Sequence, residues 1–112
     1  VTILTSLDNK SLKEIGFSKK LKKLVLDQAK LAHKAKLDAI VCSAQEVSIV
    51  KKVFKKEIIT PGIRLSGDSK GDQKRVMTPK QAFQNGATGI VMGRSLTSNI
   101  KKNIQKLIRE LN

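Results

Sequence analysis

Two arginines, each close behind a glycine at the end of an apolar run, are the residues of this chain best suited to bind a ligand. Arg64 follows the β-branched pair Ile58–Ile59, and Arg94 follows Gly93 at the end of the apolar run 89–92. A guanidinium carries a planar fork of N–H donors that matches two oxygens of a phosphate or carboxylate. Glycine allows a backbone to approach a ligand closely. Two such strand ends, brought to one edge of a sheet, predict a phosphate site.

The segment between these two arginines also fits phosphate binding. Gly67 and Gly71 allow a polar loop to bend, and Thr78 followed by Pro79 predicts a helix that begins at the proline. In (β/α)8 barrels, phosphate commonly lies between the loops after the seventh and eighth strands and a short helix.

Further side chains are candidates for polar contacts. Thr5 and Ser6 end an apolar run, where their hydroxyls and backbone amides could bind the edge of a base, although Ser6 could equally cap a helix or loop. Ser43 fits a helix cap better than a ligand contact. Cys42 would need a base to act as a nucleophile, and the single histidine, His33, fits a solvated helix position. No spacing of residues is typical of a metal site.

These residues must be positioned by alternating strands and helices. Apolar runs predict strands over residues 1–5, 38–42, 58–60 and 90–92, and helical periodicity predicts helices over 11–15, 19–36, 79–85 and about 100–111. Ser43 and Glu46 form a capping-box pattern that predicts a further helix from residue 43. Repeated strand–helix units indicate an α/β fold with parallel strands and right-handed crossovers. An open doubly wound sheet would share this pattern, but the paired arginines favour part of a barrel.

The amino-acid composition limits the classes of partner that the chain is expected to bind. The chain has 112 residues, with 23 basic and 9 acidic side chains, giving a net charge of +14. Such a charge is typical of proteins that bind nucleic acid or anionic membranes. The lysines, however, are spread over three helices, and there are three Phe but no Trp or Tyr to stack on bases. We therefore expect a solvated basic surface, with no nucleic-acid or membrane partner.

The single cysteine fits a reducing compartment, so a cytoplasmic location is expected. The sequence contains no apolar run of membrane-spanning length and no signal-peptide pattern.

Five segments, in order, resemble the orotidine 5'-phosphate decarboxylase family. They are Val1–Ser6 (VTILTS), Val41–Glu46 (VCSAQE), Pro61–Arg64 (PGIR), Gly71–Pro79 (GDQKRVMTP) and Gly93–Arg94 (GR). The resemblance extends from residue 1 to about residue 97. It implies that the chain forms strands five to eight of a TIM (β/α)8 barrel.

The resemblance also implies an activity and a set of contacts. The activity is decarboxylation of orotidine 5'-monophosphate to UMP without a cofactor, by a homodimer whose active site is shared between subunits. Arg64, Gly93 and Arg94 would bind the 5'-phosphate, and Thr5 and Ser6 would contact the pyrimidine. Pro61 would pack near the substrate carboxylate, and Gln73 would belong to a mobile loop that closes over phosphate and base.

The catalytic groups of that family are expected outside this chain. The family uses the motif Asp-x-Lys-x-x-Asp at the end of an earlier strand. Here Asp68–Asp72 (DSKGD) is one residue shorter and lies in a loop, whereas a catalytic lysine must be held rigidly. We interpret these residues as loop charges.

A complete barrel needs about 250 residues. The chain is therefore expected to be the C-terminal half of one barrel domain, inactive alone, and unstable because both sheet edges are open. Three alternatives remain. The chain could be a natural small α/β domain, another phosphate-binding barrel enzyme such as a phosphosugar decarboxylase, or a basic module that binds nucleic acid with steep salt dependence.

Overall fold

A computed structural model describes residues 1–69, 71 and 74–112 of the chain. It contains three short strands, β1 (Ala39–Val41), β2 (Glu57–Thr60) and β3 (Gly89–Ile90), which form one parallel sheet in the order β1-β2-β3. The helices are α1 (Asn9–Glu14), α2 (Leu21–Lys34), α3 (Val47–Val50), α4 (Pro79–Gln84), α5 (Arg94–Thr97) and α6 (Ile100–Leu111). The predicted alternation of parallel strands and helices is confirmed.

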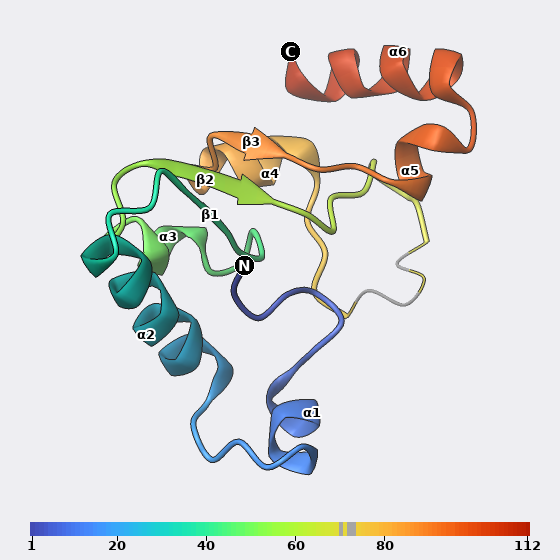
Figure 1. Cartoon of the computed structure of the whole chain (residues 1–112). Coiled ribbons are helices and arrows are strands. Elements are labelled where there is room, and N and C mark those ends of the chain that lie inside the picture. The colour runs from blue at the N-terminus through green and yellow to red at the C-terminus, as the bar shows by residue number, and fades with distance from the viewer. Residues whose placement is uncertain (70, 72–73) are drawn as a thin grey trace.

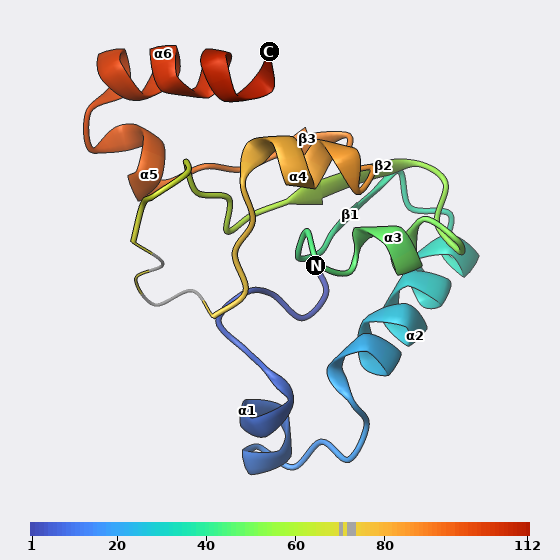
Figure 2. The ribbon, with the colours of Figure 1, turned by 180° about the vertical axis from the view of Figure 1, so that it is seen from behind.

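The helices cover the sheet unevenly. Helix α4 lies against β2 and β3, and α2 packs along α3 near β1 (Figures 1 and 2). The core between them is apolar, as expected for strands covered by helices. Its fully buried members include Val25, Val47, Val50, Phe54, Ile58 and Ile63. The loop that follows β2 and the chain segment before α1 meet on one side of the molecule, beyond the carboxyl ends of the strands (Figure 1).

The strand predicted over Val1–Thr5 is not formed. Among the described residues, its hydrogen bonds to β1 come from Thr2, whose backbone N–H and Oγ1 both donate to the carbonyl of Val41 at 2.9 Å. Further along, the carbonyl of Thr5 accepts from the N–H groups of Lys74 and Arg75 instead of a strand neighbour. One shared carbonyl is too little for a strand ladder, so the segment runs beside the sheet without joining it.

The two predicted helix starts differ in outcome. At α4 the prediction is confirmed, because Thr78 caps the helix, Pro79 is its first residue, and Gln81 completes a capping box. The capping box of Ser43 and Glu46 is wrong. Helix α3 begins at Val47, and the Glu46 side chain makes no cap hydrogen bond. The Glu46 carboxylate is used elsewhere, as described below.

The last predicted helix is present as α6, and its sequence is strongly amphipathic. None of its residues is buried, however. The apolar residues Ile100, Ile104, Ile108 and Leu111 are all more than two-fifths exposed. The helix contacts α4 and α5 and lies at the margin of the molecule (Figure 1).

Candidate functional site

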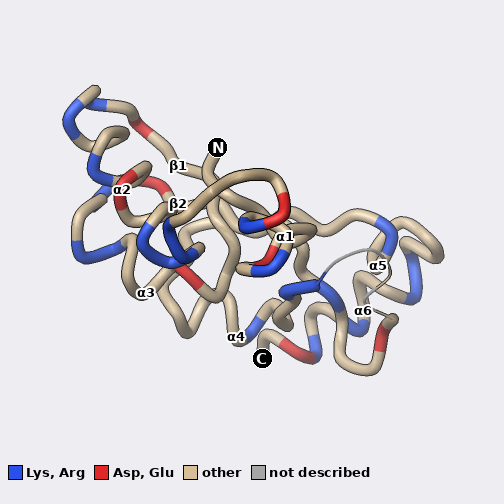
Figure 3. Tube along the Cα trace, turned by 90° about the horizontal axis from the view of Figure 1, so that it is seen from below, with Lys and Arg blue, Asp and Glu red and all other residues tan. Residues whose placement is uncertain are grey.

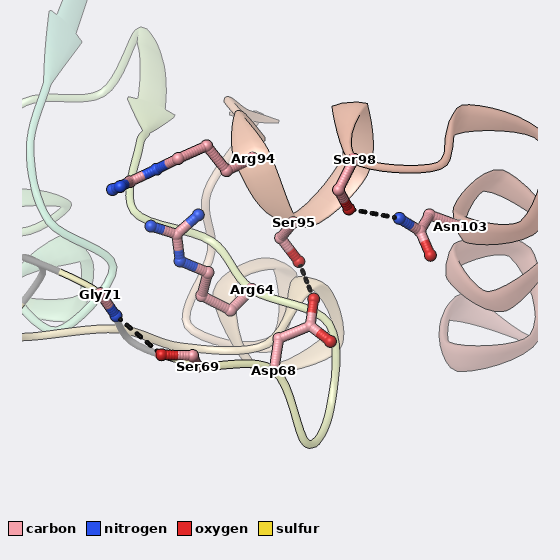
Figure 4. Close-up of a pocket in the computed structure, with 8 residues that line it drawn as sticks. All are labelled: Arg64, Asp68, Ser69, Gly71, Arg94, Ser95, Ser98 and Asn103. Carbon is pink, nitrogen blue, oxygen red and sulfur yellow. Dashed lines mark hydrogen bonds between the residues drawn. The ribbon is translucent and has the colours of Figure 1, made fainter.

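A cavity of about 310 Å³ lies where the loops after β2 and β3 meet. Arg64 enters it from the first of these loops, and Arg94 enters it from the start of α5 (Figure 4). The structure therefore brings together the two arginines that the sequence predicts as phosphate ligands. The remaining wall is polar, and it consists of Asp68, Ser69, Gly71, Ser95, Ser98 and Asn103.

Arg64 is a buried cation with an unused donor. The residue is only 8% exposed, and among the described residues its buried Nε has no hydrogen-bond partner. Its backbone is fixed, because its N–H donates to the carbonyl of Met77 at 3.1 Å and Ile63 forms a parallel bridge with the same residue. A buried donor without a partner is costly, so an anionic oxygen at this position would restore the missing interaction.

Arg94 extends across the cavity from the opposite wall. Its backbone follows Gly93, which occupies the N-cap position of α5. Its guanidinium lies over Gly71, where a Cβ atom would come within 3.4 Å of Nη2. Gly71 has φ +58, a conformation that glycine adopts without strain. A side chain at position 71 would therefore meet the Arg94 guanidinium inside the cavity wall.

The predicted base-binding residues lie outside this cavity wall. Thr5 is 3% exposed and packs against Gly62, whose added Cβ would approach the Thr5 Cγ2 to 2.5 Å. This close approach, together with φ +72, requires glycine at position 62. Ser6 is exposed, and Pro61 is partly buried beside Gly62. Gln73, predicted to close over the ligand, lies outside the described residues.

Sequence reasoning missed a second polar cluster, centred on Arg75 and Glu46. The Arg75 Nη1 donates to Glu46 Oε1 in an ion pair whose side chains are 10% and 2% exposed. The signal was present in the sequence, because Glu46 lies directly before Val47 and four residues before Val50 in an apolar segment. In the structure it is the N-cap residue of α3 and only 1% exposed. A buried carboxylate requires a partner, and that requirement outweighs a capping role.

Arg75 also ties the N-terminal segment to the end of the loop after β2. Its Nε donates to the Leu7 carbonyl at 2.9 Å, and its Nη2 donates to the Leu4 carbonyl at 2.8 Å. The backbone N–H groups of Lys74 and Arg75 donate to the Thr5 carbonyl at 2.8 and 3.2 Å. These bonds fix the position of the Thr5–Ser6 backbone relative to the loop that begins at Arg64.

The one cysteine is not arranged for catalysis. Cys42 is fully buried, and burial raises the pKa of its thiol to about 12, with the nearby Glu46 carboxylate adding to the rise and Arg75 opposing it. A thiol in this state is a poor nucleophile. Among the described residues, no group of three or more His, Cys, Asp or Glu side chains could hold a metal ion. In the same residues, no helix is long and apolar enough to cross a membrane.

Comparison with known proteins gives consistent results. The chain is 50% identical over 101 residues to an orotidine 5'-phosphate decarboxylase of Coxiella burnetii (strain RSA 331). The matched region covers 88% of this chain and 43% of that protein. It is 45% identical over 115 residues to the enzyme of that name from Carboxydothermus hydrogenoformans, covering 99% of this chain and 48% of the relative. The chain thus spans about half the length of the curated relatives it matches.

A solved structure and a family model agree with these relatives. The crystal structure of orotidine 5'-phosphate decarboxylase from Lactobacillus acidophilus superposes with a TM-score of 0.71 at 30% identity, over 99% of this chain and 47% of the other. The family model described as orotidine 5'-phosphate decarboxylase / HUMPS family matches residues 1–105. This chain therefore belongs to the orotidine 5'-phosphate decarboxylase / HUMPS family.

Proposed function

We propose that this chain is the phosphate-binding part of an orotidine 5'-phosphate decarboxylase, a carboxy-lyase that forms UMP and CO2. The observation that carries the proposal is the cavity after β2 and β3, where Arg64 and Arg94 converge and a buried Nε of Arg64 has no partner among the described residues. Family membership supports the substrate class, because the matched relatives bear this enzyme's name.

In this proposal the cavity holds the 5'-phosphate. The Arg64 and Arg94 guanidinium groups bind its oxygens, and the Gly93 backbone allows the phosphate to approach. The polar side chains of Ser69 and Ser98, on the same wall, can donate hydrogen bonds to the remaining oxygens. Binding energy from a phosphate remote from the reacting carbon can lower the barrier to decarboxylation, so these residues affect turnover as well as affinity.

Thr5 and Ser6 are proposed to contact the pyrimidine. Pro61 is proposed to pack near the substrate carboxylate, and Gln73 to contact phosphate and pyrimidine. The support is indirect, since the Arg75 hydrogen bonds fix the Thr5–Ser6 segment to the far end of the phosphate loop. The catalytic lysine and aspartates are proposed to come from another part of the barrel. We assign β1 to β3, with the segment before them, to strands five to eight of that barrel. A homodimer in the cytoplasm completes the proposal.

The test is decarboxylation by the protein expressed from its complete reading frame. Orotidine 5'-monophosphate should disappear with release of UMP, measured by chromatography. Arg94→Ala should reduce kcat/KM by about a hundredfold or more, the size expected for a lost charged contact to phosphate. The matched control is Arg109→Ala, because Arg109 is exposed on α6 and does not line the cavity. An unchanged rate in Arg94→Ala would overturn the assignment of the site.

Two alternatives predict different results. Another phosphate-binding barrel decarboxylase would leave orotidine 5'-monophosphate intact and convert a phosphosugar acid. A nucleic-acid-binding module would bind RNA or DNA with an affinity that falls steeply with salt. Lysine and arginine are distributed over several helices and do not form one stripe (Figure 3), which makes the nucleic-acid alternative the weaker of the two.

A further inference from the structure

Ser95 joins the two segments that carry the cavity's arginines. It directly follows Arg94, is 6% exposed, and its Oγ accepts a hydrogen bond from the N–H of Leu65 at 2.8 Å. The same hydroxyl donates to the carboxylate of Asp68 (Figure 4). Leu65 directly follows Arg64, so one buried hydroxyl connects the residues next to both arginines.

Helix α6 also holds this loop segment. Glu110 Oε1 accepts from the N–H of Ser66 at 2.8 Å. The Lys106 ammonium donates to the Ser66 carbonyl at 2.5 Å and lies 3.8 Å from Asp68 Oδ1. Neither Lys106 nor Glu110 lines the cavity. The segment from Leu65 to Asp68 is therefore fixed both by Ser95 and by two side chains of α6.

These hydrogen bonds hold the loop that follows Arg64 close to the segment that carries Arg94. Two arginines can bind the same phosphate only if the segments that carry them stay at a fixed separation. Hydrogen bonds to the neighbouring backbone can hold the segments together without using the arginines' own donors. Resting on the proposed function, we propose that Ser95 is a positioning residue for phosphate, which holds Arg64 beside Arg94 through its bonds to Leu65 and Asp68.

The test compares UMP with uridine, which has the same base and ribose but no phosphate. Both affinities are measured by calorimetry on the protein expressed from its complete reading frame. Ser95→Ala should weaken UMP binding about tenfold, the size expected for two lost hydrogen bonds, and leave uridine binding unchanged. Ser95→Thr keeps the hydroxyl and should restore most of the UMP affinity. Glu110→Ala should weaken UMP about threefold, although Glu110 lies outside the cavity wall.

The control is Ser48→Ala, because Ser48 is an exposed serine on α3 that does not line the cavity. A purely structural role for Ser95 would reduce the UMP and uridine affinities together, with a lower melting temperature, and would overturn the inference. So would equal UMP affinity in Ser95→Ala and the unaltered protein. If the unaltered protein binds neither UMP nor inorganic phosphate, the proposed function itself fails.

Discussion

The loop after β2 has an arginine near each end, and the two are used in opposite ways. Arg75 donates to Glu46 and to the carbonyls of Leu4 and Leu7, so its buried charge is compensated within the chain. Arg64 is equally inaccessible, yet its Nε has no partner in the described part of the chain and its guanidinium borders a cavity. A buried arginine that is paired within the chain serves the fold, whereas a buried arginine with an unpartnered Nε at a cavity is suited to bind a ligand.

The largest expected effect follows from removing Arg75. Arg75→Ala should lower the free energy of unfolding by about 3–5 kcal/mol, because it leaves the Glu46 carboxylate buried without a partner. Urea denaturation followed by circular dichroism measures this change. The double variant Glu46→Gln/Arg75→Met removes both charges and should lose less than Arg75→Ala alone. A loss below about 1 kcal/mol in Arg75→Ala would remove the contrast between the two arginines.

Arg64→Ala should show the opposite combination of effects. UMP affinity should fall about a hundredfold, which corresponds to about 2.7 kcal/mol, while the free energy of unfolding stays within about 0.5 kcal/mol. Calorimetry with UMP and urea denaturation of the same preparation measure the two quantities. Arg64→Lys keeps the charge without the fork of donors, so its affinity should be intermediate. A large loss of stability in Arg64→Ala would mean that Arg64 also serves the fold.

A smaller effect is expected where the Thr5 segment meets the end of β2. Gly62→Ala should destabilise the chain by about 1–3 kcal/mol, because a methyl group at φ +72 is strained and would overlap the Thr5 side chain. The control is Gly67→Ala, at φ +84 with nothing within 4 Å of the added Cβ. Gly67→Ala introduces only the strain of the positive φ, so it should lower the stability by less than Gly62→Ala. Equal losses in thermal unfolding would show that Thr5 does not pack as described.

The smallest effect concerns pH and Cys42. The thiol pKa is raised from 9.0 to about 12, mainly by burial. The unfolded chain therefore loses its thiol proton first, and the thiol's contribution to stability, complete below pH 9.0, is lost as pH rises toward about 12. The difference in unfolding free energy between the unaltered chain and Cys42→Ala should shrink across this range. A difference that does not change with pH would show that folding does not raise the pKa of the Cys42 thiol.

The arginine cavity could be predicted from the sequence, because each arginine follows a strand end marked by glycine, and parallel strands place those ends on one edge. The start of α4 at Thr78–Pro79 could also be predicted, because the residues that form it are neighbours in the sequence. The Glu46–Arg75 pair was not predicted, because Glu46 also matched a local capping pattern, and its partner lies 29 residues away. The prediction of an N-terminal strand was wrong for a related reason. The carbonyl of Thr5 accepts hydrogen bonds from the loop instead of from a neighbouring strand.

The Arg75 cluster also has a consequence for the order of folding. Its hydrogen bonds to Leu4 and Leu7 join residues 71 and 68 positions apart, whereas Ser95 and Asp68 are 27 positions apart. Closing the longer span costs more chain entropy, so contacts of this kind form late. The first eight residues should therefore dock after the sheet and α4 have formed. In pulse-labelled hydrogen exchange during refolding, the amides of Lys74 and Arg75 should become protected last.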